Sequence, residues 1–178
     1  QKSAINSSAR EALTVIARDL RNTGYLHIDF TREPNPEWRL IELVQKNLDG
    51  TDKLVVYQGT TPNSWIRIIY RPKKYNSCKF TTEWCNKYGN GMYLARTVIE
   101  NPTDSGSSRK IIYDDIEFVP NITDFQVVLR DKVGDELYPV CDECGPVENS
   151  QGSNTSVGSL NKGQANMQKV HTAEIYLT

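Results

Sequence analysis

Hydrophobic residues at three- and four-residue steps predict a helix at the start of the chain. Between residues 2 and 22 the apolar positions repeat with helical period, and most charged side chains fall on the other side. The pattern ends at Asn22-Thr23-Gly24, where Gly24 suits the left-handed conformation that closes many helices. No capping residue marks the start at Gln1, so we expect the helix to continue upstream. The apolar stripe comprises Ile5, Ala9, Ala12, Leu13, Ile16 and Leu20.

After Gly24 the pattern changes to the alternation typical of strands. Residues 65–71 place Ile66, Ile68 and Tyr70 on one face and arginines on the other, and residues 124–130 alternate in the same way. Turns are predicted at Leu48-Asp49-Gly50 and around Gly134. Further strands are predicted at residues 39–45, 53–58, 92–99, 110–113, 117–119 and 169–177.

The order of these elements predicts an α+β fold, with a long N-terminal helix packed on antiparallel sheet. We divide the chain into the helix, residues 1–24, and a β-rich globular domain, residues 25–178. Residues 146–164 are rich in Asn, Ser, Gly and Gln and are expected to form a loop excursion from that domain.

Composition favours one globular module with little catalytic chemistry. The 178 residues are 38% hydrophobic, enough to bury one core. The 21 basic and 22 acidic residues nearly cancel, which argues against long-range attraction to nucleic acid or an anionic membrane. The histidines are His27, in the segment after the helix, and His171, expected on the inward face of the last strand. No nucleophile and base form a recognisable pair, so we expect no enzymatic activity and no cofactor.

The four cysteines fall in two close pairs. An even count at short spacing suits disulfides and an oxidising compartment. Four cysteines allow three connectivities, and we expect the local one, Cys78 with Cys85 and Cys141 with Cys144. The alternative is a zinc site with four thiolates, which requires two tight turns; the first pair is spaced too widely for that.

Three charged clusters suggest further chemistry, each with a simpler explanation. A basic cluster interleaved with aromatic residues suits single-stranded nucleic acid, or is a solvated strand face; it comprises Arg67, Arg71, Lys73, Lys74 and Lys79, with Trp65, Tyr70, Tyr75 and Trp84. Calcium needs carboxylates at fixed loop positions, and the spacing of the candidates favours a hairpin instead; they are Asp49, Asp52, Asp131, Asp135 and Glu136. An acid–base pair for glycoside hydrolysis, or a solvated turn, is suggested by Asp114, Asp115 and Glu117.

Several segments, in order along the chain, carry a family resemblance. The helix end, residues 11–25, contains I-A-R-D-L-R-N-T-G-Y, and the first motif after it is D-K-L-V-V-Y at residues 52–57. Later segments follow in the same order at residues 93–96, 116–118, 122–127 and 170–177. This series resembles the minor pilins of type IV pili of the PilW type, and more loosely the minor pseudopilin J of type II secretion.

The resemblance implies a pilin-like fold and a structural role as the soluble domain of a subunit whose upstream apolar helix half is missing. Such a subunit would be held in the inner membrane by that missing segment, with its domain in the periplasm, and would be extracellular in the assembled pilus. Its partners would be other minor pilins, the major pilin and a PilY-type tip adhesin. The residues expected to pack the helix or to meet neighbouring subunits are Ile5, Ala9, Leu13, Ile16 and Leu20.

Two loops are expected to make partner-specific contacts, the one between Cys78 and Cys85 and the excursion at residues 146–164. Two alternative functions are a minor pseudopilin of type II secretion and a secreted adhesin, that is, a carbohydrate- or protein-binding β-domain. The sequence implies no metal site under any of these interpretations.

Overall fold

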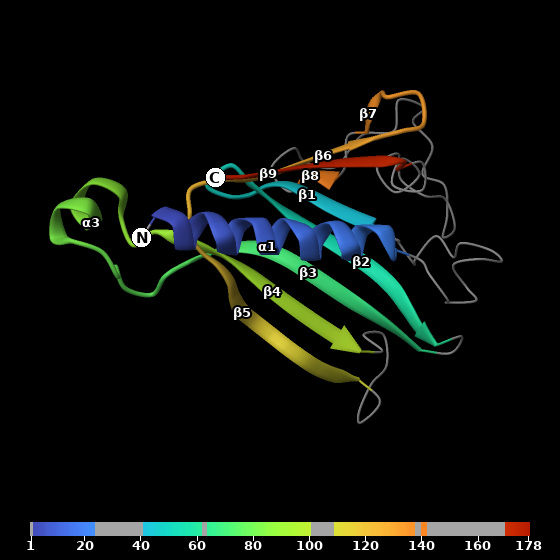
Figure 1. Ribbon diagram of the computed structural model, residues 1–178, viewed down its shortest axis with the longest axis horizontal. Coiled ribbons are helices and arrows are strands. Elements are labelled where there is room, and N and C mark those ends of the chain that lie inside the picture. The colour runs from blue at the N-terminus through green and yellow to red at the C-terminus, as the bar shows by residue number, and fades with distance from the viewer. Residues whose placement is uncertain (1, 24–40, 62–63, 101–108, 138–139, 142–169) are drawn as a thin grey trace, which may run out of the picture.

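The structure, a computed structural model, describes residues 2–23, 41–61, 64–100, 109–137, 140–141 and 170–178 (Figure 1). Its elements are α1 (Lys2–Arg21), β1 (Ile41–Leu48), β2 (Thr51–Thr61), β3 (Ser64–Lys74), α3 (Thr82–Tyr88), β4 (Met92–Glu100), β5 (Lys110–Ile122), β6 (Phe125–Arg130), β7 (Glu136–Leu137), β8 (Val140–Cys141) and β9 (Thr172–Leu177).

The larger of two sheets is built from neighbours in sequence. Its order is β5-β4-β3-β2-β1-β8, and every pair is antiparallel except β1 with β8, which run parallel. The tight turn between β1 and β2 uses positive φ angles at Asp49 (49°) and Gly50 (81°), the conformation that two-residue hairpins require. The predicted turn at Leu48-Asp49-Gly50 is therefore confirmed.

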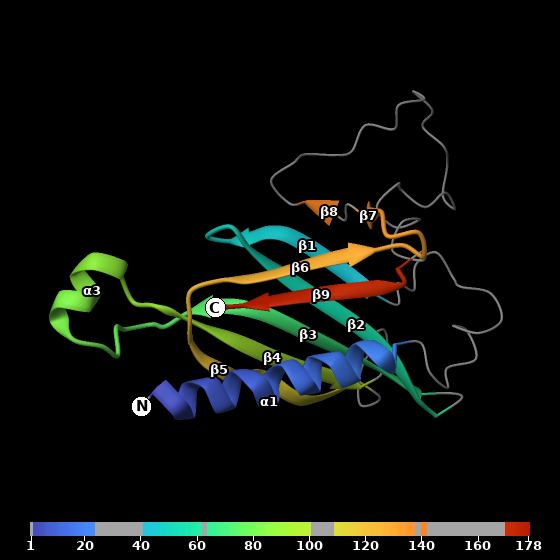
Figure 2. The ribbon, with the colours of Figure 1, turned by 45° about the horizontal axis from the view of Figure 1, so that its top comes forward.

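The smaller sheet has the order β7-β6-β9 and lies beside α1 on the same face of the larger sheet (Figures 1 and 2). Side chains from both sheets and from α1 form one core cluster, which includes Ile16, Leu54, Tyr70, Leu94 and Phe125. The alternation predicted for residues 124–130 is confirmed, since Phe125, Val127 and Leu129 are all buried. The two sheets and the helix thus share a single hydrophobic interior.

The predicted fold class is wrong. Strands make up 57% of the described residues and lie in two sheets, whereas the helical part consists of two short helices of 20 and 7 residues. The described chain is therefore a mostly antiparallel β structure, not an α+β, pilin-like arrangement organised by a long N-terminal helix. The reason is energetic: the core is made mainly by strand residues facing one another across the two sheets, and α1 supplies only Ala12 and Ile16 to its buried cluster.

The edge strand β5 joins two strands that the sequence pattern keeps separate. It runs without interruption through residues 110–122, but its pairing with β4 shifts register at four places. Asp115 and Asn121 have positive φ angles of 45° and 54° along this strand. Bulges of this kind break the regular ladder and make an edge a poor template for another strand.

Candidate functional site

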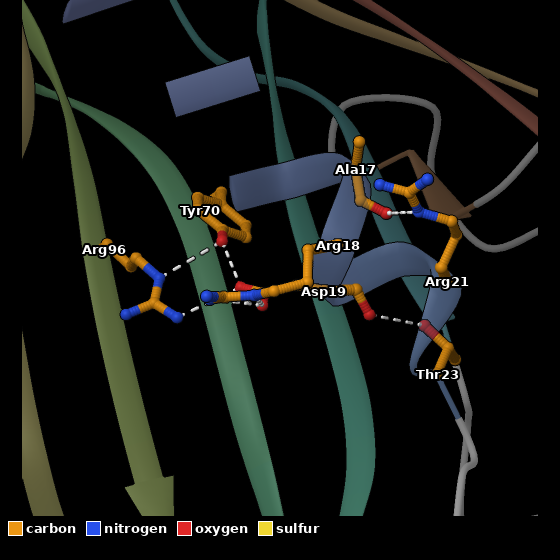
Figure 3. A network of polar contacts seen from close by, with 7 residues as sticks. All are labelled: Ala17, Arg18, Asp19, Arg21, Thr23, Tyr70 and Arg96. Atoms are coloured by element: carbon orange, nitrogen blue, oxygen red, sulfur yellow. Dashed lines mark hydrogen bonds and ion pairs between the residues drawn. The ribbon is translucent and has the colours of Figure 1, made fainter. Parts of the chain in front are cut away.

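A carboxylate is buried where α1 meets the larger sheet. Asp19 is only 2% exposed, and its two oxygens accept hydrogen bonds from different sides (Figure 3). Oδ2 accepts from the Tyr70 hydroxyl on β3 and from Arg96 Nη2 on β4, the latter at 3.0 Å. Oδ1 accepts from Arg18 Nε at 3.2 Å and Nη2 at 3.0 Å. The helix is therefore tied to two strands through one side chain.

Tyr70 and Arg96 are also in contact with each other. Arg96 Nε donates to the Tyr70 hydroxyl oxygen at 3.1 Å, and the guanidinium lies 5.8 Å from the Tyr70 ring centroid and 5.9 Å from that of Phe118. Burial raises the pKa of Tyr70 well above its usual range, and the hydrogen bond to Asp19 raises it further. Tyr70 therefore stays protonated and keeps donating to the carboxylate. We call Asp19, Tyr70 and Arg96 the buried network.

The residues of the apolar stripe of α1 differ in how deeply they are buried. Ile16 is fully buried and Leu20 packs against the core, whereas Leu13 and Ala9 are only half-buried. Ile5 belongs to α1, but its side chain lies outside the part of the chain that the structure describes. The assembly role of these residues stays a prediction.

Sequence reasoning missed the buried network, although one signal was available. Asp19 lies three residues after Ile16 and therefore on the apolar side of the helix, where a lone carboxylate is costly unless it is paired. Its partners on β3 and β4 come from distant parts of the chain, and helical periodicity cannot identify them.

A second ionic cluster lies on the opposite face of the larger sheet. Asp115 on β5 accepts from Arg71 Nε and Lys73 Nζ, each at 2.8 Å, and from Thr97 Oγ1 at 3.1 Å. The Arg71 guanidinium holds the pKa of Asp115 well below its usual range. Glu117 accepts from the Tyr75 hydroxyl at 2.9 Å. These carboxylates are structural partners of basic and phenolic groups, so their arrangement does not support the acid–base pair considered from the sequence.

Carboxylates partly offset the charge of the predicted basic cluster. Arg71 and Lys73 pair with Asp115, Lys74 Nζ lies 2.8 Å from Asp49, and Lys79 Nζ lies 3.6 Å from Glu117. Among the five basic residues proposed from the sequence, four therefore have a carboxylate close by. An extended anion such as single-stranded nucleic acid would have to compete with these pairs, which removes much of the electrostatic argument for it.

The low pKa of Asp115 has a consequence for acid stability. A carboxylate with a depressed pKa in the folded state stabilises the fold above its unfolded pKa of about 4, and that contribution is lost as the pH falls toward the folded value. We expect Asp115→Asn to lower the urea midpoint at neutral pH and to differ progressively less from the wild type below about pH 4. Asparagine still tolerates the positive φ angle.

Urea unfolding followed at a series of pH values checks this expectation. The exposed neighbour Asp114→Asn serves as the matched control and should change the midpoint little. A difference between wild type and Asp115→Asn that stays constant from neutral to acid pH would contradict the assigned role.

One of the two predicted disulfides lies in the described residues and is present. Cys78 and Cys85 are bonded, with their Cα atoms 5.9 Å apart, so this pair is not available to a thiolate zinc site. Of the second pair, Cys144 lies outside the described residues, and Cys141 is described only as part of β8. The expected excursion at residues 146–164 and His27 also lie outside the described residues.

The remaining candidate groups have local structural roles. Asp52 Oδ2 accepts from the buried Val127 N–H at 2.9 Å and so links the two sheets. Asp131 accepts from the N–H groups of Val133 and Asp135 in the β6–β7 turn, where Gly134 has a φ of 95°, so the predicted hairpin is confirmed. Within the ranges that the structure describes, no three His, Cys, Asp or Glu side chains gather as a metal site would need.

His171 is not where the sequence pattern places it. It is exposed and precedes β9, which begins at Thr172, and its N–H donates to Arg130 O at 2.8 Å. The expectation of an inward-facing strand histidine is wrong because the strand starts at Thr172, three residues later than the predicted start at Lys169, and leaves His171 outside it.

Comparison with known proteins leaves the family open. No family model matches the chain, and no curated protein and no solved structure matches it. Neither helix within the described residues is long and apolar enough to cross a membrane.

Proposed function

We propose that this chain is a structural subunit and not an enzyme: a minor pilin that joins other minor pilins to prime or cap a type IV pilus. The observation that carries the proposal is the contact between two segments of the family resemblance. Asp19 comes from the helix end A-R-D-L-R and Arg96 from the strand segment at residues 93–96, and the two are hydrogen-bonded in a buried site.

The buried network suits a subunit in which a helix and a sheet must move as one body. A buried ion pair adds little net stability compared with apolar packing, because both charges lose their hydration. It fixes geometry, however, since Asp19 meets Tyr70 and Arg96 only at one rotation and one axial position of α1. A helix held in register at this end offers its upstream part, including Ala9, to neighbouring subunits at a defined angle.

The Cys78–Cys85 disulfide supports the proposed compartment. Disulfides persist in oxidising environments such as the periplasm and the cell surface, where a pilus subunit is assembled and displayed. The buried network and the disulfide therefore favour an extracytoplasmic, load-bearing role over catalysis.

Deletion of the gene in the organism that encodes it tests the proposal. A minor pilin role predicts loss of most surface filaments, restored by the wild-type gene supplied from a plasmid. Intact filaments with failed secretion of exoproteins would instead favour the pseudopilin alternative. Intact filaments and intact secretion would contradict both and favour a secreted adhesin.

A further inference from the structure

A pocket of about 480 Å³ opens between the disulfide-closed loop and the β1–β2 turn. We define the disulfide loop as residues 75–91, the connection between β3 and β4 that contains α3 and projects from one end of the molecule (Figures 1 and 2). The pocket is lined by the aromatic rings of Trp84 and Tyr88, by the apolar side chains of Met92 and Ile122, and by the polar side chains of Asp49, Lys74, Asn90 and Thr123. Its volume lies within the range of small-molecule sites. We propose that it binds a neutral saccharide.

The aromatic rings have no role in the core of the domain. α3 has no buried residue, yet Trp84 and Tyr88 lie one turn apart on it, and Phe80, just before the N-cap Thr81, continues the four-residue spacing. The centroids of Phe80 and Trp84 are 4.1 Å apart, and those of Trp84 and Tyr88 are 5.1 Å apart. Tyr88 is 57% exposed. Exposed aromatic surface on a projecting element is typical of recognition sites.

The rings are held in place before any ligand arrives. The Cys78–Cys85 bond closes the loop, Thr81 caps α3 through Trp84 N–H, and Asn90 Nδ2 donates to the carbonyl oxygen of Tyr75 at 3.0 Å. A β-carbon at Gly91 would lie 2.8 Å from the Phe80 ring and 3.2 Å from that of Trp84, so only glycine allows this packing. A preformed site loses less conformational entropy on binding, which matters most for weak ligands.

The mixture of groups favours a sugar over other small ligands. A pyranose presents C–H bonds on its flat face, which pack against the electron-rich faces of Trp84 and Tyr88. Its hydroxyl groups both donate and accept, and they match the carboxylate of Asp49, the ammonium of Lys74 and the amide of Asn90. Asp49 and Lys74 form an ion pair at 2.8 Å, so the pocket carries no net charge from them. A neutral polyhydroxyl ligand therefore fits better than a polyanion.

Saturation-transfer-difference NMR on the full 178-residue chain tests this assignment, with chitobiose, lactose and cellobiose as the probes at millimolar concentration. We expect at least one disaccharide to show saturation transfer and, in proton–nitrogen correlation spectra of the labelled protein, to shift the amide signals of Gly89, Asn90 and Gly91. Tyr88→Ala should weaken that binding about tenfold or more, whereas Tyr88→Phe should retain most of it because the ring remains. Tyr176→Ala, which removes a ring that is 53% exposed on β9, is the matched control and should bind as the wild type does.

Three results would overturn the proposal. The first is no transfer to any of the three disaccharides from a folded protein with an intact Cys78–Cys85 bond. The second is equal binding by Tyr88→Ala and the wild type. The third is a shift of the same amides by an oligothymidylate and not by the sugars, which would assign the aromatic surface to nucleic acid. None of these results bears on filament assembly, which the gene deletion tests separately.

Discussion

Replacing Asp19 with alanine is expected to lower the free energy of unfolding by about 3–5 kcal/mol, the cost of breaking a buried pair from one side. The variant leaves the Arg96 guanidinium, whose side chain is only 13% exposed, without its carboxylate partner. Arginine cannot escape this cost by losing its proton. Urea denaturation, followed by the near-ultraviolet circular dichroism of the aromatic side chains, measures the change.

A second arginine that pairs with Asp19 provides the control. Arg18 also pairs with Asp19, but its side chain is 58% exposed, so Arg18→Ala should cost less than about 1 kcal/mol. Replacing both buried charges, as Asp19→Leu with Arg96→Met, should recover much of the stability lost by Asp19→Ala. Losses of similar size for Asp19→Ala and Arg18→Ala would show that the network is not a buried one.

Ile16→Ala is expected to destabilise the domain by about 2–5 kcal/mol, because it leaves a cavity between α1 and the larger sheet. Ile16 is fully buried and belongs to the cluster that includes Leu94 and Phe125. Thermal or urea unfolding gives the magnitude.

The control for this substitution is the same chemical change at an exposed position. Ile111 on β5 is 48% exposed, so Ile111→Ala should change stability by no more than about 0.5 kcal/mol. An equal effect of the two substitutions would mean that α1 does not pack on the sheet as described.

Short-range features of the fold could be predicted from the sequence. The alternation in β6 and the turns at Asp49-Gly50 and Gly134 depend on residues next to one another, and each prediction is confirmed. The fold class could not be predicted in the same way. The strong helical period of the first 22 residues led us to overestimate the role of the helix. The high strand content follows instead from pairing between strands far apart in the sequence, such as β1 and β8, in which Val44 lies opposite Val140.

In the candidate sites too, short-range features could be predicted from the sequence and long-range contacts could not. The pairing of Cys78 with Cys85 could be expected from spacing alone, as could the half-buried character of β3. The buried network could not be predicted because it requires three elements to meet. The sequence analysis also missed α3, because this helix is only seven residues long and the loop around it shows no extended helical periodicity. Even so, the four-residue steps from Phe80 to Tyr88 were a usable signal for an exposed helical face.

The resemblance to minor pilins remains a functional proposal that rests on named residues. Its strongest support is that Asp19 and Arg96, each from a resembling segment, are partners in the structure.

The most direct test is site-specific photo-crosslinking in the organism that encodes the chain, with the crosslinker at Ala9 on the half-buried upstream part of α1. The account predicts covalent adducts with sibling pilin subunits, identified by mass spectrometry. A crosslinker at Val133, exposed at the tip of the β6–β7 turn, should give fewer of these adducts. If Ala9 yields no adduct with a filament subunit while the protein is folded and exported, the proposed assembly role is contradicted.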